Sequence, residues 1–227
     1  MKLFENSIFI ICPTRERVER CTKMIESIRE TATGKWFLTL IVDIDDPQVK
    51  KYEKLVAPNI MVLHSMDDFI TTKINNVFRQ FNNFPFYHVT NDDFVYRTKG
   101  WDETLKNKNK ISYGNDLFSN LFPTTSVIDG DICRALGWLQ MPSLKHLYGD
   151  SVWNVIGHHL NILKYKKEVV IEHEHYMNQK AKKDHIYEKT NSKEMYKHDD
   201  LAFRTWVSEN MQSDCQQIRD ALLCDTR

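Results

Sequence analysis

An acidic pair directly after an apolar run is the first feature of this sequence that indicates chemistry. Asp92 and Asp93 follow Asn91 at the end of the apolar residues 84–90. Hard divalent cations prefer carboxylate oxygens, and such a cation neutralises the charge of a leaving diphosphate. Residues two apart on a strand face the same side, so Asn91 and Asp93 would share a face if a strand continues here. We expect Asp93 to bind metal and Asp92 to bind ribose or sugar hydroxyls; an ordinary acidic turn is the alternative.

Two histidines follow another apolar run. His173 and His175 come after residues 169–171, with one residue between them. At this spacing on a strand both imidazoles face the same side, and neutral imidazole is a common metal ligand. We expect one histidine to bind the cation and the other to contact a phosphate or the acceptor. A polar strand end with two surface histidines is the alternative.

A third carboxylate stands at a predicted helix start. Asp150 precedes residues 151–163, which have helical character. Its side chain is expected to cap this helix by accepting a backbone N–H. It could also act as a general base that removes the proton from an acceptor hydroxyl. The two roles are compatible, because a capping bond holds the carboxylate in place without consuming it.

Basic residues near both predicted sites suit a phosphate-bearing ligand. Arg15 and Arg17 follow the first apolar run, and Lys180, Lys182 and Lys183 lie in a polar segment after the histidines. Guanidinium groups bind phosphates and stack on bases, and a mobile basic loop can close over a diphosphate. Solvated surface charges are the alternative, more so for Arg17 than for Arg15.

The elements that must position these residues alternate between strand and helix in the first half. Apolar runs at residues 7–12, 36–42, 59–64 and 84–90 predict buried strands, and helical spacing is seen at residues 18–28 and 70–81. Thr14 is expected to cap the first helix and Gly34 to end it. This alternation predicts a mostly parallel sheet with helices on its faces and ligands beyond the carboxyl ends of its strands. The polar clusters at residues 14–15, 43–46 and 91–93 fall at three such ends.

The second half is less regular. Strands are expected at residues 127–128 and 169–171, a helix at 150–163 and an amphipathic stretch packing back on the body at 201–223. We expect a single domain over residues 1–227, with a nucleotide-binding half at about 1–113, an acceptor-binding half at 114–180 and a C-terminal helical tail at 181–227.

Composition excludes several classes of protein. The 31 basic and 31 acidic residues give a formal net charge of zero, which argues against tight nonspecific binding to nucleic acid. No run approaches the roughly 20 apolar residues of a membrane helix, and the N-terminus lacks the features of a signal peptide. The five cysteines form no Cys-x-x-Cys pair, so free thiols in a reducing cytoplasm are expected.

In their order along the chain, these motifs resemble those of family-2-like GT-A glycosyltransferases. The resemblance rests on residues 12–17, 43–46, 70–76, 91–93 and 148–150 and on the late histidines. It implies a GT-A fold, a nucleotide-sugar donor with UDP as the usual nucleotide, Mn²⁺ or Mg²⁺ as cofactor, and inversion at the anomeric carbon. The implied metal ligands are Asp93 with His173 or His175, and the implied base is Asp150. With the expectations above, the donor site comprises Pro13, Thr14, Arg15, Asp43, Asp45, Lys73, Asp92 and Lys180.

A narrower set of motifs is similar to small bacteriophage-encoded glycosyltransferases, some of which modify hydroxymethylated pyrimidines in DNA. This set includes residues 98–102, 113–116, 149–153, 172–175 and 184–187. It implies that Asp116 and Trp153 contact the acceptor or the sugar, and that modified DNA is one candidate acceptor. No oligomeric state is assigned.

Two departures from the family pattern keep alternatives open. Asn91 replaces the first aspartate of the Asp-x-Asp motif, and the second-strand cluster leaves Asp43 or Asp45 to meet the nucleoside. A binding protein that has lost turnover is therefore one alternative. A nucleotidyltransferase is another, but it would usually carry a glycine-rich phosphate loop, whereas this chain has only seven glycines and Pro13 at that position.

Overall fold

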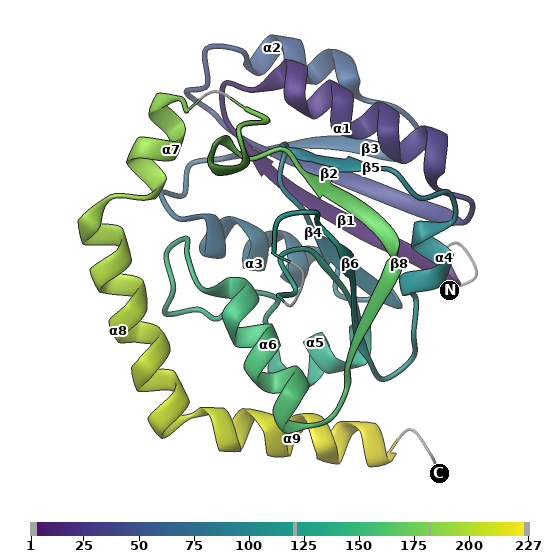
Figure 1. Cartoon of the computed structure of the whole chain (residues 1–227), viewed down its shortest axis with the longest axis vertical. Helices are drawn as coiled ribbons and strands as arrows, with labels where there is room; N and C mark the ends of the chain where they lie inside the picture. Colours follow the sequence, from purple (N-terminus) through teal and green to yellow (C-terminus); the bar gives the residue numbers. More distant parts are fainter. Residues whose placement is uncertain (1–3, 120–121, 182, 225–227) are drawn as a thin grey trace.

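A single mixed sheet organises the molecule. The computed structural model describes residues 4–119, 122–181 and 183–224. Its eight described strands follow the order β3–β2–β1–β4–β7–β6–β8–β5 (Figure 1). They are β1 (Ser7–Thr14), β2 (Lys35–Asp43), β3 (Ile60–Ser65), β4 (Phe86–Val89), β5 (Phe94–Tyr96), β6 (Ile111–Asn115), β7 (Ser126–Asp129) and β8 (Leu163–His173).

The sheet confirms the expected α/β architecture, and its parallel part lies in the first half of the chain. Strands β3, β2, β1 and β4 are parallel neighbours. Beyond β4, the sheet becomes mixed, because β7 runs antiparallel to both β4 and β6, and β5 runs antiparallel to β8. The expected boundary near residue 113 falls within β6, so one sheet runs through both predicted halves.

Helices cover both faces of the sheet. They are α1 (Val18–Thr31), α2 (Val49–Tyr52), α3 (Ile70–Gln80), α4 (Trp101–Leu105), α5 (Gly130–Leu136), α6 (Gly149–His159), α7 (His185–Thr190), α8 (Lys193–Glu209) and α9 (Met211–Cys224). Figure 1 shows α1 and α2 on one face, α3, α5 and α6 on the other, and α8 and α9 along the outside of the molecule. None of the helices in the described ranges is long and apolar enough to cross a bilayer.

The central strand β1 explains why the site is held firmly. All eight of its residues are buried. Because side chains alternate along a strand, Phe9 and Ile11 join the apolar cluster with α3, whereas Ile8 and Ile10 join the cluster with α1. Both faces of β1 therefore pack against apolar side chains of helices, as is usual for the inner strands of a parallel sheet. The residues at its carboxyl end are therefore fixed by the two cores.

Several local expectations were wrong. Thr14 is the last residue of β1 and caps no helix; its hydroxyl donates to Asp92, 2.7 Å away. The first helix ends at Thr31, ahead of Gly34, whose N–H donates to the Asp102 carboxylate. A Cβ at position 34 would lie 2.9 Å from Asp102 Oδ2, so this close approach explains the glycine.

Three further corrections concern the site segments and the tail. Strand β4 ends at Val89, so residues 91–93 form a turn and strand alternation does not relate Asn91 to Asp93. Tyr148, in a left-handed conformation with φ 66°, holds the N-cap position of α6, and Asp150 is the second residue of that helix. The expected amphipathic stretch is two helices, α8 and α9.

Candidate active site

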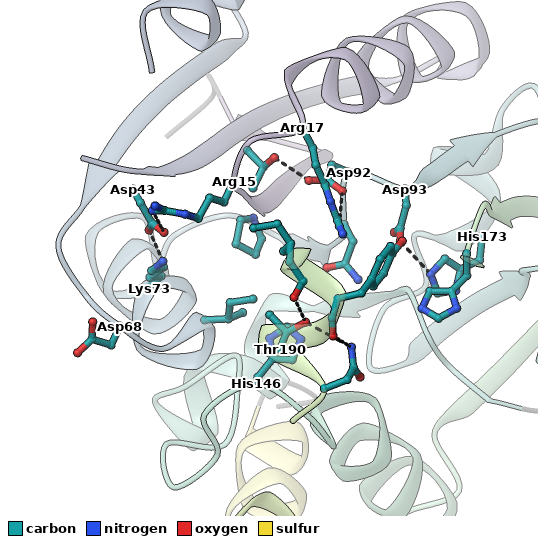
Figure 2. Close-up of a pocket in the computed structure, with 18 residues that line it drawn as sticks. Arg15, Arg17, Asp43, Asp68, Lys73, Asp92, Asp93, His146, His173 and Thr190 are labelled. Atoms are coloured by element: carbon teal, nitrogen blue, oxygen red, sulfur yellow. Dashed lines mark hydrogen bonds and ion pairs between the residues drawn. The ribbon is translucent and has the colours of Figure 1, made fainter. Parts of the chain in front are cut away.

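A cavity of about 230 Å³ opens beyond the carboxyl ends of β1, β2 and β4. Figure 2 shows Asp43 on one side of it and His173 on the other, with Arg17 and Asp92 between them. The site therefore lies where parallel strand ends place it, and it gathers most of the polar residues that the sequence singled out.

On the β2 side, one carboxylate is held between two cations. Asp43, the last residue of β2, accepts from Arg15 Nη1 at 3.1 Å and forms an ion pair with Lys73 of α3. Arg15 also binds Asp45, whose side chain is 73% exposed. Asp43 lines the cavity, whereas Asp45 lies on the outer side of Arg15, in a separate surface hollow.

On the other side, Asp93 lies close to a histidine and a tyrosine. Its Oδ2 accepts the Tyr187 hydroxyl at 2.6 Å and lies 3.4 Å from His173 Nε2. Burial alone would raise the pKa of Asp93, but hydrogen bonds from His173 and Tyr187 outweigh it and lower the pKa. Asp93 Oδ1 and His173 Nδ1 are buried with no hydrogen-bond partner among the described residues. An ionised carboxylate with an orphaned buried oxygen has unused capacity for a cation.

Asp92 has a different environment from its neighbour. It accepts from Thr14 Oγ1 at 2.7 Å and from Arg17 Nη1 at 3.4 Å. Burial, and then the charge of Asp93, raise the pKa of Asp92 to about 6. The two adjacent carboxylates thus have pKa values shifted in opposite directions, which is a frequent property of functional sites.

The short helix α7 closes one wall of the cavity. Asp184 caps α7 and binds Arg17 through both carboxylate oxygens, at 2.9 and 2.6 Å. The Arg17 guanidinium lies 4.1 Å from the centre of the Tyr187 ring, which is cation–π range. The sequence analysis gave Arg17 the same candidate role in phosphate binding as Arg15, with a solvated surface charge as the alternative, and it gave Tyr187 no role of its own. The sequence signal for Tyr187 was its spacing from Asp184. The residue that Asp184 binds, Arg17, lies 167 positions away in the sequence.

A second cavity of about 220 Å³ adjoins the first. Ile70, Asn91 and His146 line both cavities, so the two cavities lie side by side. Asp150 and Trp153 of α6 line the second cavity. Burial raises the pKa of Asp150, whose Oδ1 accepts from Ser151 N at 2.8 Å. A carboxylate of raised pKa beside the first cavity suits proton abstraction.

The described arrangement does not bring every expected residue to these cavities. Lys180 forms an ion pair with Glu172 and lines a small hollow behind Asp92 and Asp93. Asp116 accepts from Phe118 N, Ser119 N and Thr124 Oγ1, and Thr124 lines the second cavity. Trp153 reaches the second cavity, but its indole N–H donates to Leu139 O.

The side chains fit a partial metal site. Across residues 4–119, 122–181 and 183–224, no group of three or more His, Cys, Asp or Glu side chains is arranged to hold a metal ion. Asp93 and His173 offer two ligands, and the His175 ring lies 5.0 Å from the His173 ring. Mg²⁺ in particular is often held by one or two protein ligands plus substrate phosphates. The residues therefore fit a cation that arrives with a phosphate ligand.

Comparisons with known proteins concern the fold. No family model matches the sequence, and no curated protein is significantly similar to it. Among solved structures, S. aureus TarS 1–349 in complex with UDP-GlcNAc matches with a TM-score of 0.58 at 12% identity, over 95% of this chain and 71% of that chain. The mannosyltransferase PcManGT from Pyrobaculum calidifontis, in complex with GDP-Man and Mn²⁺, matches with a TM-score of 0.56 at 9% identity, over 96% of this chain and 74% of that chain.

GalNAc-T7 with UDP, GalNAc and Mn²⁺ gives a TM-score of 0.60 at 9% identity, over 74% of this chain and 43% of that chain. The chain spans only 36% of the longer TarS structure. At these identities the likeness concerns the arrangement of the backbone. Together with the parallel strands, the mixed sheet beyond β4 and the C-terminal helices, it establishes that this chain has a GT-A fold.

Proposed function

We propose that this protein is a metal-dependent glycosyltransferase that moves a sugar from a nucleotide-sugar donor, a UDP-sugar, to an acceptor hydroxyl. The observation that carries the proposal is the pairing of two adjoining cavities. One holds the Asp93–His173 pair at the ends of parallel strands, and the other holds Asp150. A donor site and a general base next to it are what sugar transfer requires.

The nucleoside is assigned to the β2 side of the first cavity. Asp43 is fixed between Arg15 and Lys73, so its position is preorganised, while the two cations keep donors for a phosphate or carbonyl group. Pro13 and Thr14 form the adjacent floor at the end of β1. TarS was solved with UDP and with UDP-GlcNAc, which supports uridine as the nucleoside.

The diphosphate is assigned to the side of Asp93. Asp93 and His173, or His175 in its place, would hold Mn²⁺ or Mg²⁺, which neutralises the charge of the leaving diphosphate. PcManGT and GalNAc-T7 were both solved with Mn²⁺, which supports this cofactor. Arg17 lies between Asp92 and Asp184 and can contribute further positive charge once a donor is bound.

Asp150 is assigned as the base of an inverting reaction. It would accept the proton of the acceptor hydroxyl as that oxygen bonds to the anomeric carbon, while the bond from this carbon to the diphosphate breaks. The nucleoside diphosphate leaves with the electron pair of that bond. Because attack and departure occur on opposite faces, the configuration inverts. The raised pKa of Asp150 matches this task.

The alternative is a donor-binding protein without turnover. It is favoured by Asn91 in place of the first motif aspartate and by the Tyr187 hydroxyl that already occupies Asp93 Oδ2. Both hypotheses predict nucleotide binding, but only the enzyme releases nucleoside diphosphate from a nucleotide-sugar donor.

Calorimetric titration of UDP, GDP, CDP and ADP, with and without Mn²⁺, tests the donor site. We expect UDP to bind in a metal-dependent way, and Asp93→Ala to abolish this binding. Asp220→Ala is the matched control, because Asp220 is exposed on α9, away from the cavity-lining residues. If no nucleotide binds with metal present, or if Asp93→Ala binds as tightly as the control, the proposed function is wrong.

A further inference from the structure

The two cavities differ in charge. Arg15, Arg17 and Lys73 line the first cavity. Among the described residues that line the second cavity there is no lysine or arginine, and Asp150 is its only acidic side chain. Residues 120 and 121, outside the described ranges, are asparagine and leucine in the sequence. The second cavity is therefore built without a counter-charge for an anion.

The remaining ionisable side chain between the cavities is also uncharged. His146 is half-buried and lines both cavities, and burial lowers its pKa to about 4. Its Nδ1 is buried without a partner among the described residues. A neutral imidazole offers hydrogen bonds to a ligand but no attraction for a phosphate.

Neutral polar groups dominate the rest of the second cavity. Within the described part of the chain, no hydrogen bond engages the Ser126 hydroxyl or the side-chain amides of Gln140 and Asn91, although all three residues line this space. Such groups pair with hydroxyls without needing a net charge on the ligand. Trp153 and Ile128 supply an apolar wall, a combination common in small-ligand sites.

Resting on the proposed function, we propose that the group accepting the sugar in the second cavity is an uncharged, hydroxyl-bearing sugar residue. A phosphate placed there would face the Asp150 carboxylate with no cation among the described lining residues to offset it. Like-charge contact of this kind is a strong device against wrong partners. The zero net charge of the chain gives no compensating long-range attraction for a polyanion.

The test compares neutral acceptors with anionic ones. With the donor identified by titration, transfer is measured to methyl glycosides of common hexoses, to their 6-phosphates, and to a DNA duplex containing hydroxymethylcytosine. We expect product with at least one methyl glycoside, and kcat/KM at least about tenfold higher than for its phosphate. Equal or faster transfer to the phosphate or to the DNA overturns the proposal, as does donor hydrolysis without transfer to any neutral acceptor.

Two variants at one position separate the effect of charge from the effect of side-chain size. Gln140→Lys places a cation of similar length in the second cavity, and Gln140→Met is its uncharged control. We expect Gln140→Lys to raise kcat/KM for the phosphorylated acceptor by about tenfold over Gln140→Met. No difference between these two variants contradicts the charge argument. Nucleotide binding by both variants shows that the donor site is intact, so failure of this proposal is distinguishable from failure of the proposed function.

Discussion

The two adjoining cavities are built from different parts of the chain and on different principles. The first lies at parallel strand ends, and its charges are paired with one another: Arg15 with Asp43, Lys73 with Asp43, and Arg17 with Asp184. The second lies between α6 and loop residues, and carries a single carboxylate with no cation among its described lining residues. In the first cavity a charged ligand meets side chains that are already held in ion pairs, whereas the second cavity offers an anion no cation among its described lining residues.

This contrast implies that the two cavities have separate functions, which substitutions in each cavity can test. The first cavity should determine donor affinity, and the second should determine the chemical step. A variant on one side that alters both properties equally would show that the cavities form one functional unit.

Asp150→Asn should have the largest effect on this comparison. Removing a general base typically lowers kcat by about 10²–10⁴-fold, while binding of the nucleotide and metal should be unchanged because Asp150 lies outside the first cavity. Steady-state kinetics and calorimetry on the same preparation measure both. Substantial turnover in the folded variant would remove Asp150 from the mechanism.

The pH profile provides the control for that variant. A base works only when ionised, so activity should fall as the pH drops through the pKa of Asp150. Because burial raises this pKa, the acid limb should lie above the ordinary aspartate value of about 3.9. The residual activity of Asp150→Asn should lack that limb.

Asp199→Ala should have the next largest effect, a loss of stability. Asp199 joins α8 to residues 145–147, the loop that contains His146. The fully buried Asp199 carboxylate accepts from the backbone N–H groups of Lys145, His146 and Leu147. Leaving three buried donors unpaired should lower the free energy of unfolding by about 3 kcal/mol, measured in urea. Asp200→Ala, which removes a partly exposed pair with Arg204 and a 3.2 Å hydrogen bond from the Tyr148 hydroxyl, should cost about 1 kcal/mol or less.

The stabilisation from Asp199 should also depend on pH. Burial would raise its pKa, but hydrogen bonds from His198 and the loop N–H groups outweigh burial and lower it. A carboxylate whose pKa is lower in the folded state stabilises the protein at pH values above its unfolded pKa of about 3.9. That stabilisation is lost as the pH falls through the pKa of the folded state. Wild type and Asp199→Ala should therefore converge in stability in acid. A constant difference down to pH 2 would contradict this account.

What the sequence could predict follows the same division between the cavities. The strands that end at Thr14, Asp43 and Val89 are local apolar runs, so their order and the polar residues after them were accessible from pattern alone. The pairing of Arg17 with Asp184 and the positions of Tyr187 and His146 were not, because they depend on α7 and α8 packing back across the molecule. The N-cap of α6 was missed because Tyr148 adopts a left-handed conformation, which is rare for a non-glycine residue.

Tyr187→Phe should have a moderate effect, and it asks whether α7 restrains the first cavity. The Tyr187 hydroxyl donates to Asp93 Oδ2, so it competes with a cation for the charge of that oxygen. A hydrogen bond to a charged group contributes about 1.5–3 kcal/mol, and part of that should return as up to about tenfold tighter nucleotide binding with Mn²⁺. Calorimetry measures the change.

The opposite result for Tyr187→Phe would also be informative. Weaker binding in the variant would mean that the hydroxyl contacts the donor once Asp93 is released, and that α7 belongs to the bound state. Asn191 also lines the cavity from this segment, but its amide donates to Tyr187 O and Thr190 Oγ1, away from Asp93. Asn191→Ala therefore serves as the control for general loosening of α7, and should not tighten nucleotide binding.

The smallest expected effect separates the two aspartates that sequence reasoning left as alternatives for the nucleoside. Asp43 lines the cavity between Arg15 and Lys73, whereas Asp45 is 73% exposed and pairs with Arg15 from outside. Asp43→Asn should weaken UDP binding by about fivefold, equivalent to the roughly 1 kcal/mol of one hydrogen bond. Asp45→Asn should change it by less than about twofold, because exposed ion pairs contribute little and are screened by salt. Equal effects of the two substitutions would mean that Arg15, rather than Asp43, carries nucleoside recognition, since Arg15 pairs with both aspartates.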